Sequence, residues 1–221
     1  MSLKSKLVIR FPIALVTFGT LLFLPAGSFR FWQAWVYIGI MFVPGLLVFV
    51  YFYKRDPQVL ERRSLLKEKV PEQRRIMGLI YVTWLVALLL PGFDHRYGWS
   101  RQPLWLTVLS EFLVLSGYLT TFWVVKKNRF AARTIQVERG QEVISNGPYR
   151  VVRHPMYLGI CIMWLFTPLA LGSYFTLPVF ALLIPLIALR LLNEEKVLRQ
   201  ELAGYTEYCS QTRFRLVPFV W

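Results

Sequence analysis

The chain changes from polar to apolar within one stretch, Asn146-Gly147-Pro148-Tyr149-Arg150-Val151-Val152-Arg153-His154-Pro155-Met156-Tyr157-Leu158-Gly159. Its first three residues, with asparagine, glycine and proline in a row, have the composition of a turn. Pro155 suits the first position of a helix, where a missing N–H costs no hydrogen bond, and His154 then falls in the capping region. The stretch therefore predicts a turn followed at once by an apolar helix.

Two interpretations fit the charges of this stretch. The N–H groups at the helix start, beside Arg150 and Arg153, would form a seat for a carboxylate or phosphate. Alternatively, the stretch is a turn at a membrane interface, with its arginines on lipid headgroups and its tyrosines in the aromatic belt. The local residues leave both interpretations open.

The composition around this stretch is that of a membrane protein. Of 221 residues, 56% are hydrophobic, 16% are aromatic and 17% are charged. A soluble domain of this size rarely combines so much apolar surface with so little charge, and here the apolar residues also form long runs. The net charge of +14 is confined to the segments between those runs. It therefore indicates contact with a membrane surface and not with nucleic acid.

The apolar runs predict an all-α, polytopic integral membrane bundle with about six crossings, or five if the first segment is re-entrant. The predicted segments are 7–24, 31–53, 76–90, 104–125, 155–171 and 174–192. Pro91-Gly92 is expected to end the third. The last two are joined by Gly172-Ser173 alone, so they are expected to form an antiparallel helical hairpin.

Positive charge supports this count. Suppose that the chain crosses the membrane six times and begins in the cytoplasm. All of its 26 lysines and arginines then fall on the cytoplasmic side, except Arg30, Arg96 and Arg101. Such a bias follows the positive-inside rule. We therefore expect an integral protein of a prokaryotic inner membrane or, in a eukaryote, of the endoplasmic reticulum, with its functional site on the cytoplasmic side.

Polar residues within the second half of the chain gather at one place. Arg190 and Glu194 lie four residues apart, on one helix face at the end of the sixth segment. Because that segment and the fifth form a hairpin, His154 and Tyr157 are expected to meet them. Ionisable groups that meet at membrane depth suggest a functional site. A juxtamembrane salt bridge between Arg190 and Glu194 is the alternative interpretation.

The loop before this stretch has a weaker pattern, and the cysteines have none. Residues 134–138 alternate like a strand and 142–144 could pair with them, so a small flap and an irregular loop are both open. Cys161 and Cys209 lack metal-ligand spacing, and no metal site is predicted. The sequence also lacks a serine–histidine–acid set and a glycine-rich phosphate loop.

Several motifs together resemble one enzyme family. They are Gly147-Pro148-Tyr149-Arg150-Val151-Val152-Arg153-His154-Pro155-Met156-Tyr157, Arg190-x3-Glu194-Glu195, Gly204-Tyr205-x2-Tyr208 and Arg215-Leu216-Val217-Pro218. In this order they resemble the isoprenylcysteine carboxyl methyltransferases and the related phospholipid N-methyltransferases. The resemblance covers roughly residues 136–221, and the part before it matches as hydrophobic helices.

This resemblance implies a membrane enzyme that uses S-adenosylmethionine on a lipid or prenylated substrate taken from the bilayer. It implies N-terminal transmembrane helices in 1–125, and a cofactor-binding loop, helical hairpin and tail in 126–221, as one integrated domain. Arg190 would bind the substrate carboxylate, and Arg190 and Glu194 would form the catalytic pair. The residues implied at the cofactor are Gln136, Gln141, Glu142, Val143, Ile144, Tyr149, His154, Pro155, Met156, Tyr157 and Glu194.

One departure from the family and several alternatives remain open. The glycine–tyrosine spacing differs by one residue, so Glu195 could take the role given to Glu194. Carboxyl O-methylation of an isoprenylcysteine-like amphiphile is the expected reaction, and phosphatidylethanolamine-type N-methylation is the alternative. The membrane sterol reductases, which use NADPH, share an Arg-His-Pro motif and a terminal Arg-x-x-Pro. A lipid-binding protein without enzymatic activity is the remaining class.

Overall fold

The structure is a computed structural model that describes residues 3–64, 68, 70–131, 134–135, 137–138 and 140–221. Within these residues all regular secondary structure is helical. The α-helices in chain order are α1 (Leu3–Ala26), α2 (Trp32–Arg55), α3 (Pro57–Ser64), α4 (Pro71–Tyr97), α5 (Leu104–Lys127), α6 (Pro155–Ala170), α7 (Leu177–Ala181), α8 (Leu183–Glu201) and α9 (Tyr205–Gln211).

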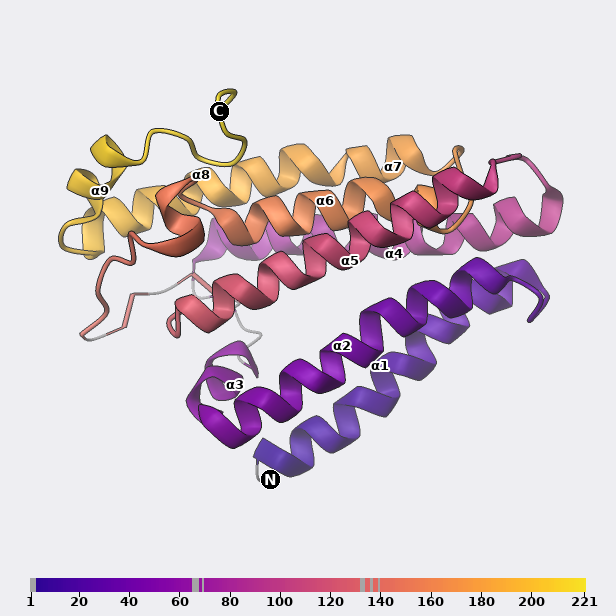
Figure 1. The fold of residues 1–221 in the computed structure, drawn as a ribbon, viewed down its shortest axis with the longest axis horizontal. Coiled ribbons are helices and arrows are strands. Elements are labelled where there is room, and N and C mark those ends of the chain that lie inside the picture. The colour runs from indigo at the N-terminus through magenta and orange to yellow at the C-terminus, as the bar shows by residue number, and fades with distance from the viewer. Residues whose placement is uncertain (1–2, 65–67, 69, 132–133, 136, 139) are drawn as a thin grey trace.

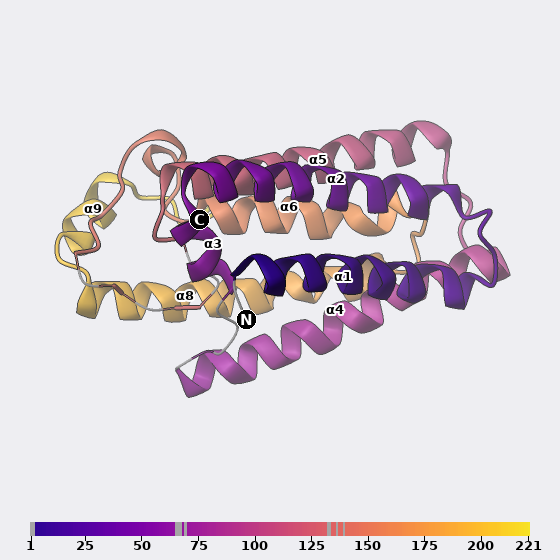
Figure 2. The ribbon, with the colours of Figure 1, turned by 90° about the horizontal axis from the view of Figure 1, so that it is seen from below.

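The long helices run side by side between two ends of one bundle (Figures 1 and 2). One end, which we call the basic end, holds α3, the segment 128–154 and α9. The other, the short-loop end, holds the connections 27–31, 98–103 and 171–176. Arg30, Arg96 and Arg101, which the charge pattern set apart, all belong to the short-loop end. The predicted alternation of the chain between two ends is therefore present.

The predicted class, an all-helical integral membrane bundle, is confirmed. Among the described residues, five helices are long and apolar enough to cross a membrane, counting α7 and α8 as one. The remaining apolar segment, the fifth in chain order, is α6, which has 16 residues, or about 24 Å of helix, against a hydrocarbon core of about 30 Å. Helix α1 is continuous over 24 residues, so the first segment is not re-entrant.

Two predicted segment ends were wrong. Helix α4 continues through Pro91 to Tyr97 instead of ending at Leu90. Gly92 lies where α4 packs closely against α1, because a Cβ added there would lie 2.6 Å from the Leu22 carbonyl oxygen. The Pro-Gly pair thus allows a close helix contact and does not end the helix. The connection between α6 and α7 also covers residues 171–176, longer than the two residues expected.

The predicted C-terminal hairpin is present, with an interruption in its second arm. Helices α7 and α8 are separated at Leu182. Pro185 accounts for this interruption, because it lacks the N–H that would bond the carbonyl of Ala181. The return arm still reaches the basic end, so α8 brings Arg190 and Glu194 beside the start of α6 (Figure 1).

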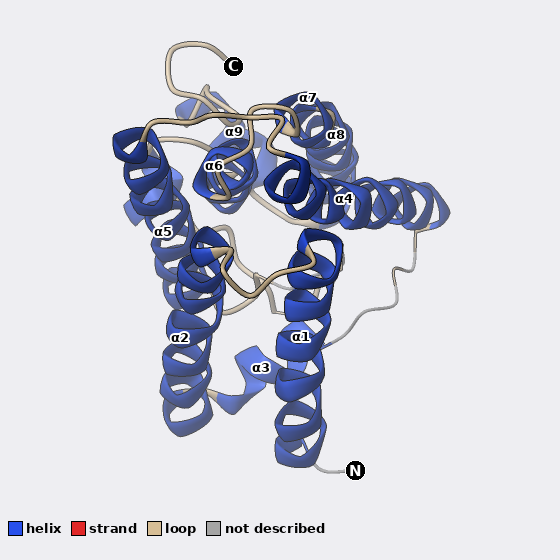
Figure 3. Cartoon of the chain, turned by 90° about the vertical axis from the view of Figure 1, so that its right-hand side faces the viewer, coloured by secondary structure: helices blue, strands red, loops and turns tan. Residues whose placement is uncertain are grey.

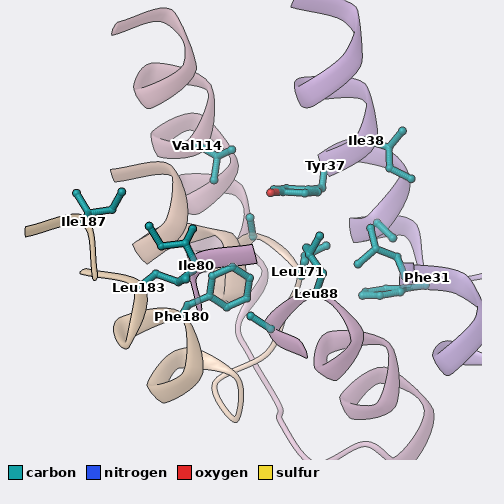
Figure 4. Packing of buried hydrophobic residues seen from close by; sticks show 14 of the residues in the cluster. Phe31, Tyr37, Ile38, Ile80, Leu88, Val114, Leu171, Phe180, Leu183 and Ile187 are labelled. Atoms are coloured by element: carbon teal, nitrogen blue, oxygen red, sulfur yellow. The ribbon is translucent and has the colours of Figure 1, made fainter. Parts of the chain in front are cut away.

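The core fills the space between these helices (Figure 4). Phe31, Leu88, Phe180 and Leu183 are almost completely buried in one cluster. Helices α5 and α6 approach closely at two glycines, where a Cβ on Gly117 would lie 2.6 Å from the Gly159 carbonyl oxygen. Small residues at such crossings are typical of helix packing in membranes. This contact fixes α6, whose first turn forms part of the site.

Candidate functional site

The segment between α5 and α6 is anchored at both ends by Asn128. Its side-chain oxygen accepts a bond from the Phe130 N–H at 3.0 Å, and its amide nitrogen donates to the Tyr149 hydroxyl at 2.9 Å. The described residues between these anchors form an irregular loop, so the strand-like flap is not observed.

Helix α3, in the N-terminal half of the chain, also anchors this loop. Arg62 Nε lies 2.9 Å from Glu138 Oε2, and Arg62 Nη1 donates to the Arg129 carbonyl at 3.2 Å. Arg63 Nη1 donates to the Ala131 carbonyl at 3.0 Å. Two arginines of one short helix therefore fix the loop at three points.

The turn and helix start predicted around Pro155 are confirmed. Gly147 has φ 60° and opens a 3₁₀ turn, Gly147–Arg150, and α6 begins at Pro155 with His154 as its N-cap residue. The C-terminal segment pairs with this stretch through the backbone. The Arg153 N–H donates to the Phe214 carbonyl and the His154 N–H to the Arg215 carbonyl, both at 2.9 Å.

Glu195 sits at the centre of what we call the tail cluster, formed with Arg153, His154 and Arg215. Arg153 Nε donates to Glu195 Oε1 at 2.6 Å and Arg215 Nε to Oε2 at 3.0 Å. His154 Nε2 lies 3.4 Å from Oε1. The Glu195 residue is 3% exposed. Arg153, one of the two arginines considered as an anion seat, is therefore already paired with a carboxylate of the same chain, while Arg150 is exposed.

Arg190 and Glu194 are joined through a third residue in a second group, the cleft cluster, which also contains Glu68 and Gln73. Tyr157 donates its hydroxyl hydrogen to Glu194 Oε2 at 2.5 Å and accepts a bond from Arg190 Nε at 3.1 Å. The Tyr157 hydroxyl therefore bridges Arg190 and Glu194. Arg190 Nη1 lies 2.8 Å from Glu68 Oε1 and donates to Gln73 Oε1 at 3.2 Å.

Glu68 connects this cluster to the loop. While Oε1 pairs with Arg190, Oε2 accepts a bond from the Ile135 N–H at 3.2 Å. Gln73 in turn donates to the Arg190 carbonyl at 3.2 Å. Both partners come from sequence more than a hundred residues before α8. No local pattern marks them, because their role depends on how α4 packs against α8.

A pocket lies beneath the loop, and we call it the loop pocket. It is lined by nearly all the residues expected at the cofactor. They are Gln141, Glu142, Val143, Ile144, Tyr149, His154, Pro155, Met156, Tyr157 and Glu194. Gln136 lies outside the described residues. The α8 and α9 side of the same pocket is formed by Leu198, Leu202, Tyr205 and Tyr208. None of the four was among the expected cofactor residues, although the two tyrosines belong to the motif Gly204-Tyr205-x2-Tyr208.

Tyrosines give this pocket neutral hydrogen-bonding groups. Burial raises the pKa of Tyr149 to about 12, although the bond from Asn128 opposes the shift. Burial likewise raises the pKa of Tyr208, whose hydroxyl donates to the Tyr149 carbonyl at 2.7 Å. These phenols stay protonated at neutral pH. They position the loop and offer apolar ring faces, and they do not act as bases.

A larger cavity, the central cleft, adjoins the loop pocket. Its volume is about 670 Å³, and its walls come mostly from apolar side chains of α1, α2, α4, α6 and α8. Tyr81 of α4 lines it and is 45% exposed, so the cleft reaches the outer surface of the bundle. Arg190 lines this cleft. The residues that line both cavities are Thr134, Ile135, Met156, Tyr157 and Glu194.

The expected meeting of four residues is largely observed. Tyr157, Arg190 and Glu194 are in contact, while His154 turns toward Glu195 and toward Tyr205, whose hydroxyl lies 3.4 Å from His154 Nε2. Glu194 and Glu195, between which the sequence left the cofactor contact open, have different surroundings. Glu194 lines both cavities, and Glu195 lines neither.

The fold and these paired cavities define a class, the polytopic membrane proteins with a polar pocket beside a lipid-sized cleft. Residues 105–203 match the family model described as phospholipid methyltransferase. This match begins within α5, upstream of the motifs found in the sequence, and stops before the C-terminal tail.

The fold is similar to a solved structure of the eukaryotic intramembrane Ras methyltransferase ICMT, isoprenylcysteine carboxyl methyltransferase. The TM-score is 0.50 and the identity 15%, over 100% of this chain and 88% of that one. At this identity the likeness shows the fold. The family match over residues 105–203 and this fold both support the predicted resemblance to the isoprenylcysteine carboxyl and phospholipid methyltransferases. The chain is thus an integral membrane helical bundle whose residues 105–203 are similar to the phospholipid methyltransferases.

A curated relative comes from the rival class. The Delta(14)-sterol reductase of Mus musculus is 32% identical over 91 residues, which are 40% of this chain and 22% of the reductase. The chain therefore spans about a fifth of the length of that relative. The similarity is partial, in keeping with the motifs that the two classes share.

Proposed function

We propose that this protein is an S-adenosylmethionine-dependent methyltransferase of a lipid-like substrate. The reaction that we favour is carboxyl O-methylation of an isoprenylcysteine-like amphiphile. The observation that carries the proposal is the shared wall between the loop pocket and the central cleft. A methyl donor on one side and a lipid acceptor on the other would meet at Tyr157 and Glu194.

The residues of the loop pocket fit this cofactor. Glu194 offers a carboxylate to hydroxyl, amine or N–H donors, which S-adenosylmethionine carries. Val143, Ile144 and the rings of Tyr149 and Tyr205 offer apolar surface for an adenine. When bound, S-adenosylmethionine supplies an electrophilic methyl group. The proposed cofactor residues are those expected from the sequence, and Glu194 is preferred to Glu195 because Glu195 is held by two arginines.

The central cleft would position the methyl acceptor. Its apolar walls suit a prenyl or acyl chain, and its exposed side at Tyr81 suits entry from the bilayer. A planar guanidinium such as that of Arg190 suits a carboxylate. Because Glu68 already pairs with Arg190, a substrate carboxylate would share or replace that partner. Arg190 and Glu68 are both buried, so water would be kept away from the methyl transfer. Such a transfer depends on positioning more than on acid–base groups.

N-methylation of a phosphatidylethanolamine-type lipid is the second candidate. The match of residues 105–203 to the phospholipid methyltransferase family favours it. The two candidates differ in the acceptor, since a carboxylate is already a nucleophile at neutral pH whereas an ammonium must first lose a proton. Both would have the basic end in the cytoplasm, as the positive-inside rule favours.

Two experiments test the proposal. In the first, the purified protein is titrated separately with S-adenosylhomocysteine and with NADPH. Binding of the first and not the second is expected, and the reverse would favour a reductase. In the second, labelled S-adenosylmethionine is supplied with a farnesylcysteine acid, with phosphatidylethanolamine and with a total lipid extract. Label on the farnesylcysteine ester supports O-methylation, and label on the amine lipid alone would replace it with N-methylation.

A further inference from the structure

A cavity on the outside of the basic end, which we call the outer cleft, is separate from the site described above. Its volume is about 300 Å³. One wall comes from Arg150 and Val151 in the turn before α6, and the other from residues 211–214 with Pro218 and Phe219. Among the described residues, none that lines it also lines the loop pocket or the central cleft.

The polar part of the outer cleft is formed by two arginines. Arg150 and Arg213 both line it, and both are exposed. Arg150 belongs to the turn considered as an anion seat, where Glu195 pairs with the neighbouring Arg153 instead. Within the part of the chain that the structure describes, the side chains of Arg150 and Arg213 make no ion pair or hydrogen bond, and no carboxylate lines the cleft. The cleft therefore presents two positive charges to a ligand.

The apolar part of the outer cleft belongs to a closed loop, residues 217–221. The Val217 carbonyl accepts bonds from the Val220 N–H at 3.2 Å and from the Trp221 N–H at 3.0 Å. Phe219, inside this loop, has φ 64°, a left-handed conformation that costs energy in a residue with a Cβ. Phe219 is 89% exposed and Val220 79%. Backbone strain thus coincides with two apolar side chains that face outward.

This loop lies at the depth of a membrane surface. The Arg153 N–H donates to the Phe214 carbonyl at 2.9 Å, immediately before the apolar helix α6 begins. Leu216, next to the loop, is 5% exposed and belongs to the hydrophobic core of the bundle. Figure 3 shows the C-terminal loop projecting beyond α6 and α9, on the side of the bundle away from α3. The loop is therefore beside the transmembrane helices, at the level where headgroups meet acyl chains.

We propose that the outer cleft binds the headgroup of an anionic phospholipid from the surrounding leaflet. The phosphate would lie between Arg150 and Arg213, because guanidinium groups bind phosphate by charge-assisted hydrogen bonds. Phe219 and Val220 would enter the boundary between headgroups and acyl chains beside it. The bound lipid would brace the C-terminal segment, which is joined to the start of α6 at Phe214. The inference rests on this outer surface and is independent of the proposed methyl transfer.

The test measures lipid binding to the full-length protein by native mass spectrometry. Delipidated protein in detergent is titrated with phosphatidylglycerol and with phosphatidylcholine of the same acyl chains. We expect tighter binding of phosphatidylglycerol, because phosphatidylcholine carries no net charge. Arg150→Gln and Arg213→Gln should each weaken phosphatidylglycerol binding about fivefold, whereas Phe219→Ser should weaken the binding of both lipids. All three positions are exposed, so the variants should fold with an unchanged apparent Tm.

Arg75→Gln is the matched control, because Arg75 is an exposed arginine near the start of α4, at the same end of the bundle, and does not line the cleft. It should leave the binding of both lipids unchanged. Equal binding of both lipids by the unmodified protein would overturn the proposal, as would a loss in Arg75→Gln as large as in the two cleft variants. Displacement of phosphatidylglycerol by equimolar glycerol phosphate would also overturn it, because the cleft would then bind a soluble anion.

Discussion

Glu194 and Glu195 are neighbours on α8, yet they belong to two different clusters. In the tail cluster, both oxygens of Glu195 accept bonds from guanidinium groups, those of Arg153 and Arg215. In the cleft cluster, Glu194 accepts a bond from the neutral Tyr157 hydroxyl and lines two cavities. Adjacent residues of a helix point about 100° apart, so one turn of α8 presents one carboxylate to each cluster.

This difference in partners suggests that Glu195 contributes to the stability of the fold and that Glu194 contributes to ligand binding. A carboxylate matched by two arginines joins the C-terminal tail to the start of α6 and has little capacity left for a ligand. A carboxylate that faces a cavity keeps acceptor capacity for one. The two clusters therefore predict opposite effects for the same chemical change at the two positions.

Glu195→Gln should have the largest effect, and that effect should be on stability. The change leaves Arg153, which is 6% exposed, buried without a carboxylate partner. Removing one partner of a buried ion pair costs about 3–5 kcal/mol. We expect a large fall in the apparent Tm in detergent, measured by scanning fluorimetry. Glu207→Gln, an exposed position on α9, is the control and should leave the Tm unchanged.

Glu194→Gln should have the next largest effect, on cofactor affinity. Loss of a charged acceptor costs about 1.5–3 kcal/mol, or roughly 10–150-fold in the Kd of S-adenosylhomocysteine. The Tm should change little, and exposed Glu201→Gln on the same helix should change neither quantity. Reduced affinity in Glu195→Gln at a normal Tm, with none in Glu194→Gln, would show that the two roles are reversed.

The sequence predicted the helices better than their ends. Long apolar runs mark a membrane helix regardless of its neighbours, and the six predicted segments correspond to helices in the structure. Pro91-Gly92 was misleading because a close approach of α1 to Gly92 uses the same residues that usually end a helix. Such a contact depends on tertiary packing and leaves no local signal.

The site shows the same division between local and distant information. Tyr157, Arg190 and Glu194 were expected together because the hairpin and the helical period place them. Glu68 and Gln73 were missed because their partners lie in α8, far along the chain. An external anion at Arg153 was one of two interpretations of the sequence, and its carboxylate partner, Glu195, became visible once α8 and the tail were placed. Partner identity in buried clusters thus requires the fold.

Arg190→Lys should have a smaller effect, confined to the acceptor side. Lysine keeps the charge but cannot reproduce the fork that contacts Glu68, Gln73 and Tyr157 together. We expect the turnover of a lipid acceptor to fall about tenfold, with S-adenosylhomocysteine affinity nearly unchanged. Arg199→Lys, exposed on the same helix, serves as the control. Equal losses of acceptor turnover and cofactor affinity would indicate that Arg190 supports the site structurally.

Tyr157→Phe should have the smallest effect and should link the two sides of the site. The change removes one hydroxyl that donates to Glu194 and accepts from Arg190. Losing a hydrogen bond of this kind costs about 0.5–1.5 kcal/mol, so cofactor affinity and acceptor turnover should each fall about two- to tenfold. Tyr53→Phe, at an exposed tyrosine of α2, is the control and should change neither.

The double variant Tyr157→Phe/Glu194→Gln decides how these residues are coupled. If the hydroxyl acts by holding the Glu194 carboxylate toward the loop pocket, the loss of cofactor affinity in the double variant should be smaller than the sum of the two single losses. Additive losses would mean that Tyr157 acts on the cofactor side independently of Glu194. In that case the contact between them is one of packing, and the division between the two clusters rests on Glu194 alone.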